Sequence, residues 1–173
     1  MNELVLIAVT GHSNLSEASK PLIKEELMMR FARYSASELT GMSCLAAGAD
    51  AVFADAVLTV GGRLLVVIPS EDYRERMVDH RYADDFDRLC GAAAGVKVMP
   101  YQKATANAYA AANRVLLNRA DLLMAVWDGR VGGRRGGTSD AVTMARAQGL
   151  PVEIVWPPGA ARRNGNRDPG RRR

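Results

Sequence analysis

The chain has 173 residues, 48% hydrophobic and 24% charged, a composition typical of one globular domain with a single core. Its formal net charge is +4, but residues 159–173 hold six of the 23 basic and one of the 19 acidic residues. Residues 1–158 therefore carry 17 basic and 18 acidic side chains, so the expected fold lacks a broad basic surface for nucleic acid.

The chain also lacks the features of a membrane or secreted protein. No apolar run approaches the roughly 20 residues that a membrane-spanning helix needs. The apolar start, Met1–Thr10, has no basic n-region and no small-residue cleavage site, which favours a strand over a signal peptide. Cys44 and Cys90 are the only cysteines, and we expect both to be reduced thiols in the core. We therefore expect a cytoplasmic protein with no membrane partner.

The first half of the chain alternates between short apolar runs and helical patterns. Leu4–Val9 is typical of a buried strand and ends in the turn 10–14. A helix from about Pro21 follows, then a weaker strand at Leu39–Cys44. Gly48–Val60 has an apolar stripe that predicts a helix. The next predicted strand is Leu64–Ile68.

The second half repeats this alternation. Residues 70–80 are charged and predict a long loop, followed by a helix near 81–90. A strand is expected at 96–99, an Ala-rich helix at 105–118 and a strand at 122–127. A glycine-rich loop then leads into a helix over 139–148, and the last strand is 152–156.

This alternation predicts an α/β fold, with a mostly parallel sheet of about six strands and helices on both faces. We assign residues 1–158 to this domain. Residues 159–173 contain no hydrophobic side chain larger than Ala, so we expect a disordered basic tail. In such sheets, ligands bind beyond the carboxyl ends of the strands, which directs attention to the loops 10–14, 43–48, 69–80, 100–104 and 127–138.

The glycine-rich loop 129–137 is the most informative of these loops. It leaves a buried strand and enters a helix, where free backbone N–H groups and the positive end of the helix dipole attract an anion. We therefore expect Gly136, Gly137 and Thr138 to hold a phosphate group. The alternative is a flexible surface connection. The lysine of a P-loop is replaced by Thr138, and no dinucleotide-binding G-x-G-x-x-G is present.

Three stretches resemble the SLOG superfamily, which contains the Lonely Guy phosphoribohydrolases, the DNA-processing protein A family and sensors of nucleotides derived from NAD. They are Leu6–His12, Thr40–Asp50, and Asp121–Gly129 running into Gly136–Thr138. Over residues 4–156 the resemblance implies a Rossmann-like fold, a nucleotide or nucleotide-sugar ligand and a homodimer. The residues that it implies for binding are Gly11, Ser43, Gly48, Gly136, Gly137 and Thr138.

One position departs from the Lonely Guy pattern, whose catalytic glutamate lies three residues after the Thr. That position is Ala141 in this chain, and the nearest acid is Asp140, turned by roughly 100° on a helix. N-glycosidic cleavage needs a carboxylate close to the ribose or the attacking water. Asp140 is the candidate catalytic residue if the protein is an enzyme, and the displaced acid makes cleavage less favoured than binding.

Two further residues of the strand-end loops are candidates for ligand contact. His12 follows the first strand, and Asp128 follows the fifth, where it forms either an Asx-turn or a ribose or base contact. Asp50 is better explained by the dipole of its helix than by ribose binding. We expect neither a metal nor a separate cofactor.

Three functions follow from these patterns. The first is a binding module or sensor for a phosphorylated nucleotide or nucleotide-sugar. The second is a nucleotide N-glycosidase that uses Asp140 or Asp128. The third, single-stranded DNA binding through the Arg-rich tail, is disfavoured because the domain lacks an aromatic stacking platform.

Overall fold

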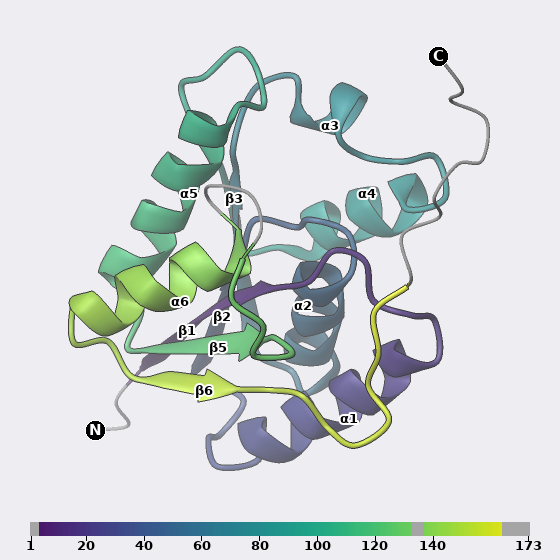
Figure 1. Ribbon diagram of the computed structural model, residues 1–173, viewed down its shortest axis with the longest axis vertical. Coiled ribbons are helices and arrows are strands. Elements are labelled where there is room, and N and C mark those ends of the chain that lie inside the picture. Colours follow the sequence, from purple (N-terminus) through teal and green to yellow (C-terminus); the bar gives the residue numbers. More distant parts are fainter. Residues whose placement is uncertain (1–3, 133–136, 164–173) are drawn as a thin grey trace.

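The computed structural model describes residues 4–132 and 137–163. Its six strands form one parallel sheet in the order β4-β3-β2-β1-β5-β6, which confirms the predicted α/β fold (Figure 1). The strands are β1 (Val5–Gly11), β2 (Leu39–Ser43), β3 (Arg63–Ile68), β4 (Gly95–Val98), β5 (Leu122–Val126) and β6 (Val152–Ile154).

Within the described residues, six helices cover the two faces and the edge of this sheet. They are α1 (Ser19–Phe31), α2 (Ala49–Thr59), α3 (Tyr73–Arg76), α4 (Ala83–Ala92), α5 (Ala106–Arg119) and α6 (Thr138–Ala147). α1, α2 and α4 lie on one face, and α5 and α6 lie on the other (Figure 1). The helices predicted from periodicity agree with the structure to within two or three residues at most ends.

Side chains of β1 alternate between the two hydrophobic cores, one on each face of the sheet. Ile7 and Val9 pack with α1 and α2, whereas Ala8 packs with α5 and α6. A strand that is buried on both faces must be apolar throughout, which explains the continuous apolar run that predicted it. α1 contributes Ile23, Leu27 and Phe31 to the first core, as its spacing predicts.

The charged segment after β3 is the main difference from the predicted elements. It contains the short helix α3, whereas the sequence predicts only a loop. Tyr73 explains the helix, because its side chain is 2% exposed and packs against Phe86 of α4, with ring centroids 6.1 Å apart. A four-residue helix has too few hydrogen bonds to show in a sequence pattern, and here tertiary packing stabilises it.

The last described residues, up to Arg163, also differ from the prediction. Residues 159–163, predicted to belong to a disordered tail, pack along the segment between β1 and α1, with Arg162 paired to Leu15 in an antiparallel bridge. Backbone and side-chain hydrogen bonds hold them, and a prediction based on hydrophobic content does not register such bonds. Residues 164–173 of the predicted tail lie outside the described residues.

Candidate functional site

The sheet order places a topological switch point between β1 and β5. From β1 the chain proceeds outward through β2 and β3 to β4, then crosses through α5 to β5 on the other side of β1. Gly11 pairs in register with Val126, and the His12 N–H donates to the Val126 carbonyl at 3.1 Å. The loops that follow β1 and β5 leave the sheet here, where ligands of such folds bind.

Gly11 lies at this edge because α2 packs directly against it. A Cβ atom at Gly11 would meet the Cβ of Ala49 and would lie 2.8 Å from the Cβ and carbonyl oxygen of Val126. The packing of α2 on the end of β1 therefore requires glycine at this position, whatever ligand binds nearby.

Gly48 has a similar packing role on the neighbouring loop. Its φ of +82° favours glycine, and a Cβ would lie 2.6 Å from the carbonyl oxygens of His12 and Ser13. The next residue, Ala49, donates its N–H to the His12 carbonyl at 3.0 Å. The first amide of α2 is therefore occupied by the β1–α1 segment.

Ser43 lies beneath the surface of the site. Its side chain is fully buried, its Oγ donates to the Asp50 carbonyl at 3.2 Å, and it accepts from the Leu45 N–H at 3.0 Å. Leu45 has a positive φ of 52°, so the turn that Ser43 holds is a tight one. In this structure Ser43 fastens the β2–α2 loop.

Asp50 also holds this loop from below. Its carboxylate accepts from the Ala46 N–H at 3.2 Å, and its residue is 8% exposed. Burial raises the pKa of Asp50 to about 7, although the N–H groups of Ala46 and Cys44 oppose the rise. Asp50 lies in the first turn of α2, as predicted, and its hydrogen bond with Ala46 also joins the helix to the β2–α2 loop.

His12 and Asp128 meet at the switch point. His12 Nε2 lies 3.0 Å from Asp128 Oδ1 and 3.2 Å from the Asp128 backbone N, with both side chains about one-tenth exposed. A neutral ring accepts the backbone N–H through Nε2, whereas a protonated ring donates to the carboxylate. Burial lowers the pKa of His12, and the charge of Arg162 lowers it further, while the hydrogen bond with Asp128 opposes both.

Asp128 forms the Asx-turn expected as one of its two roles. Its Oδ1 accepts from the Arg130 N–H at 3.1 Å, and its Oδ2 lies 3.5 Å from Arg162 Nη1. Partial burial acts to raise the pKa of Asp128, but these partners and His12 outweigh it and lower the pKa. The carboxylate is therefore ionised and held by three parts of the chain.

The start of α6 differs from the β1 and β2 loops. Gly137 is the N-cap, with extended backbone and no side-chain cap hydrogen bond, and the helix begins at Thr138. Because α6 returns antiparallel to β5 before the parallel strand β6, its N-terminus lies at the carboxyl edge of the sheet. Gly136, the third member of the predicted phosphate loop, lies outside the described residues.

The first turn of α6 also places the candidate catalytic acid. Asp140 is exposed, whereas Ala141 beside it is 2% exposed and faces the core. Ala141, where the Lonely Guy pattern has its glutamate, is therefore a packing position in this chain, and Asp140 lies on a different side of the helix.

Sequence patterns give no indication of the C-terminal strap, which we define as residues 160–163. Ser16 N–H donates to the Ala161 carbonyl at 2.9 Å, and Arg163 N–H donates to the Asn14 carbonyl at 2.7 Å. The fully buried Ser19 Oγ accepts from the Ala161 N–H at 2.7 Å. The turn at Pro157-Pro158-Gly159, closed by the Ala160 N–H donating to the Pro157 carbonyl at 3.0 Å, precedes the strap, but a turn sequence does not predict what the following residues contact.

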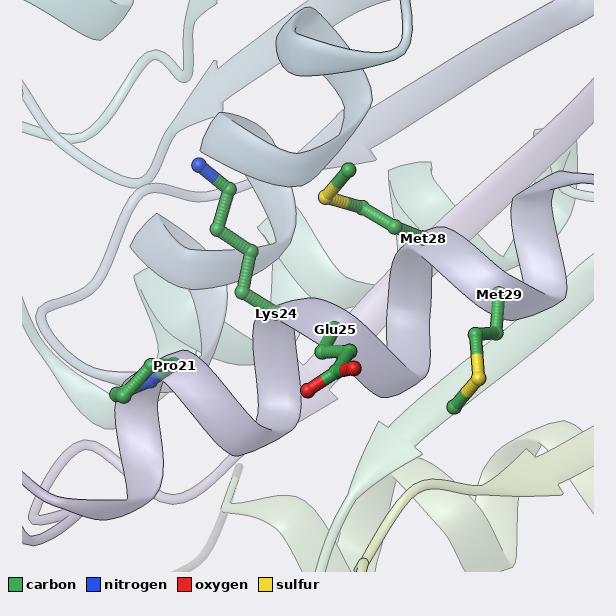
Figure 2. A pocket seen from close by; sticks show the side chains of 5 residues that line it. All are labelled: Pro21, Lys24, Glu25, Met28 and Met29. Carbon is green, nitrogen blue, oxygen red and sulfur yellow. The ribbon is translucent and has the colours of Figure 1, made fainter.

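Two hollows lie on the α1 side of the molecule. One is a groove of about 390 Å³ between α1, α2 and α4. Of the predicted site residues that the structure describes, only Gly48 lines it. The other, about 500 Å³, lies on the outside of α1, with its lining side chains Pro21, Lys24, Glu25, Met28 and Met29 shown in Figure 2. All five come from one helix, so no second element supplies a facing wall, and the outer hollow is an exposed surface.

Three features of the described residues bear on metal binding, thiol chemistry and membrane insertion. Within residues 4–132 and 137–163, no three His, Cys, Asp or Glu side chains gather where they could hold a metal ion. Cys44 and Cys90 are both free thiols, and Cys44 is buried in the core as expected, whereas Cys90 is only half-buried. None of the described helices combines the length and hydropathy required to cross a bilayer.

Comparison with solved structures confirms the Rossmann-like fold. DNA processing protein A from Streptococcus pneumoniae is 18% identical, with a TM-score of 0.64 over 87% of this chain and 50% of that one. The same protein from Helicobacter pylori, described for its single-stranded DNA binding mode, is 15% identical, with a TM-score of 0.62 over 88% and 65%. This chain therefore spans about half to two thirds of the length of these two proteins.

A second group of similar structures binds a cofactor. The molybdenum cofactor binding protein from Rippkaea orientalis is 15% identical, with a TM-score of 0.59 over 88% of this chain and 76% of that one. No protein-family model matches the sequence, and no curated protein matches it either.

Proposed function

We propose that this chain binds a phosphorylated nucleotide or nucleotide-derived molecule at the carboxyl edge of its sheet, with a phosphate at the first turn of α6. The observation that supports this most directly is the start of α6 at the edge beside the switch point, where the extended N-cap residue Gly137 places no side chain over the first turn. The first amides of such a helix attract an anion.

The other loops at this edge support binding through shape and rigidity. Ser43 and Asp50 fix the β2–α2 loop from below, and Gly11 and Gly48 let the chain segments approach closely. A ligand contact by His12 or Asp128 requires the ligand to replace or join the existing His12–Asp128–Arg162 interactions. A molybdenum cofactor binding protein has the same fold, which is consistent with a small-molecule ligand.

Thermal unfolding with AMP and ADP-ribose at millimolar concentration tests the proposal. A ligand that binds only the folded state raises the unfolding temperature. Thr138→Val keeps the shape of the side chain and removes the hydroxyl, so we expect affinity to fall about tenfold. Gly137→Val adds bulk at an extended position and should weaken binding further, whereas Gly91→Ala on α4 is the matched control, because its Cβ meets nothing within 4 Å. No stabilisation by either compound would contradict the proposal.

Hydrolysis of the ligand is a separate outcome of the same design. Free base released from nucleoside 5′-monophosphates, and lost in Asp140→Asn, would make the protein an N-glycosidase. We propose binding without cleavage, because Asp140 is exposed on α6 and Asp128 is already ion-paired with Arg162.

Single-stranded DNA binding is the other alternative, and one observation bears on it. The strap ties Arg162 and Arg163 to the fold, so part of the predicted basic tail belongs to the domain. A variant that ends at residue 163 keeps the strap and removes the rest. Oligonucleotide binding that survives this truncation and decreases steeply with salt would favour the DNA function over nucleotide binding.

A further inference from the structure

The groove between α1 and α4 has the dimensions of a small-molecule site. Its floor is one side of α2, on which Gly48, Ala51, Val52 and Asp55 follow one another at helical spacing. Because Ala51 carries only one side-chain carbon, it leaves space between the two flanking helices. The volume of about 390 Å³ lies within the range of ligand pockets.

Ion pairs join the two walls of the groove at Asp55. Asp55 lies 2.7 Å from Lys24 of α1 and 3.1 Å from Arg88 of α4, and it therefore joins the two walls. Arg88 also pairs with Asp85 at 3.2 Å. These carboxylates have cationic partners already and offer no free negative charge to a ligand.

The mouth of the groove, which we define by Glu17, Lys20, Asp79, Arg81 and Arg163, also contains carboxylates that have hydrogen-bond or ion-pair partners. Glu17 pairs with Lys20 at 2.8 Å, and Asp79 accepts from the Arg81 N–H at 2.8 Å and lies 3.2 Å from the His80 ring. The guanidinium groups of Arg81 and Arg163 form no ion pair within the described residues, although both interact electrostatically with Asp79, and Arg163 also with Glu17. Lys20, Arg81 and Arg163 nevertheless outnumber Glu17 and Asp79 in the lining. The charge left over at the mouth is positive.

The strap fixes the position of Arg163. Its N–H donates to the Asn14 carbonyl, and the preceding residue forms a bridge with Leu15. Successive side chains of an extended segment point to opposite sides. Arg162 accordingly reaches Asp128 at the switch point, whereas Arg163 lines the groove.

The remaining lining is largely apolar and favours an organic body on the ligand. Pro21 of α1, Ala51 and Val52 of α2 and Leu89 of α4 line the groove. The Tyr82 hydroxyl donates to the Leu45 carbonyl at 3.0 Å, so its polar end is already used.

We infer that this groove is a second binding site, separate from the start of α6, for an amphipathic organic anion. The carboxylate, sulfonate or phosphate of the ligand lies at Arg81 and Arg163, and its apolar body lies along α2. The strap completes this site, because without it the groove lacks one of its two unpaired cations.

Fluorescence titration of the full chain with 1-anilinonaphthalene-8-sulfonate, an aromatic sulfonate, tests the inference. We expect saturable binding of one equivalent. The double variant Arg81→Ala/Arg163→Ala should weaken it by about tenfold or more, the loss of at least one charge-assisted hydrogen bond. The matched control is Arg119→Ala/Arg146→Ala, which removes two exposed arginines from α5 and α6 and should leave the titration unchanged.

The uncharged analogue N-phenyl-1-naphthylamine separates charge from shape. Its binding should be insensitive to the Arg81/Arg163 change and should be lost in Ala51→Leu, which fills the groove. Circular dichroism and urea unfolding confirm that each variant is folded. If Ala51→Leu fails to fold, the comparison of the Arg81/Arg163 and Arg119/Arg146 double variants still tests the inference.

Two outcomes would overturn the inference. One is sulfonate binding that does not saturate, and the other is equal weakening by the two arginine pairs. Gly137→Val should change nucleotide binding and leave the sulfonate titration as in the wild type, so failure of one site does not imply failure of the other.

Discussion

The β2–α2 loop and the β5–α6 loop lie at the same edge of the sheet, and both contain glycines. The surroundings of these glycines differ. Gly48 is enclosed by the backbone of His12 and Ser13. Gly129 and Gly132 have positive φ values of 80° and 130°, and a Cβ on either would meet nothing within 4 Å. The first loop is packed against the β1–α1 segment, whereas the described part of the second leaves space around its glycines. A glycine pattern alone therefore does not distinguish a packing requirement from an open loop.

The largest expected effect separates these two kinds of glycine. Gly48→Ala combines a strained φ with a backbone clash, so we expect the free energy of unfolding to fall by about 4 kcal/mol. Gly129→Ala carries the strain without the clash and should cost about 1 kcal/mol. Urea unfolding of both variants measures the difference. Equal losses would mean that the two loops do not differ in packing.

The β2–α2 loop should also show a pH dependence that comes from Asp50. Its folded pKa of about 7 lies above the ordinary value of 3.8, so the folded protein binds the proton more tightly than the unfolded chain. Stability contributed by this group is therefore present at low pH and is lost as the pH rises from about 4 to about 7, by about 3 kcal/mol. Asp50→Asn should flatten this part of the curve of unfolding free energy against pH. An unchanged slope would contradict the burial of a titrating carboxyl.

Ser43 distinguishes a structural role from a ligand contact. Ser43→Ala leaves the Leu45 N–H without its acceptor in a buried position, so we expect a loss of about 2 kcal/mol without any ligand. Ser37→Ala, at an exposed position, is the control. If Ser43→Ala weakens nucleotide binding but leaves unfolding unchanged, Ser43 faces the ligand and the loop is more open than described.

The smallest expected effect concerns Arg162 of the strap and its contact with the His12–Asp128 pair. Arg162→Ala removes a positive charge near His12, so the pKa of His12 should rise. Because the folded pKa of His12 lies below its ordinary 6.5, protonation costs folding free energy, and the stability from this group is lost as the pH falls through that region. An NMR titration of the ring protons of His12 measures the shift. No change in Arg162→Ala would mean that the strap does not reach the pair in solution.

Much of the fold could be predicted because the evidence for it is local. The apolar run at β1 and the helical spacing of Ile23, Leu27 and Phe31 result from burial on two faces or one, which leaves a period in the sequence. α3 and the strap cannot be predicted in this way. α3 depends on the packing of Tyr73 on Phe86, and the strap depends on hydrogen bonds between Ser19 and Ala161, and neither contact produces a periodic pattern in the sequence.

The candidate site was predicted in part for the same reason. The loops at the carboxyl ends of β1 and β5 follow from the parallel sheet, and the structure brings His12 and Asp128 together there. That Ser43 lies buried, and that Asp128 is shared with Arg162, depends on contacts across 7 and 34 residues of chain, which single residue types do not reveal.

The sequence by itself determined the alternation of strands and helices, the parallel sheet and the edge at which its loops gather, since each of these follows from hydrophobic period and turn chemistry. Only the tertiary structure decided which polar groups at that edge are already satisfied by the protein and which remain at the surface of a groove. The physical reason is that hydrogen-bond and ion-pair partners are chosen by proximity in space, and the chain brings Arg162 to Asp128 and Arg163 to the α2 groove only after it has folded.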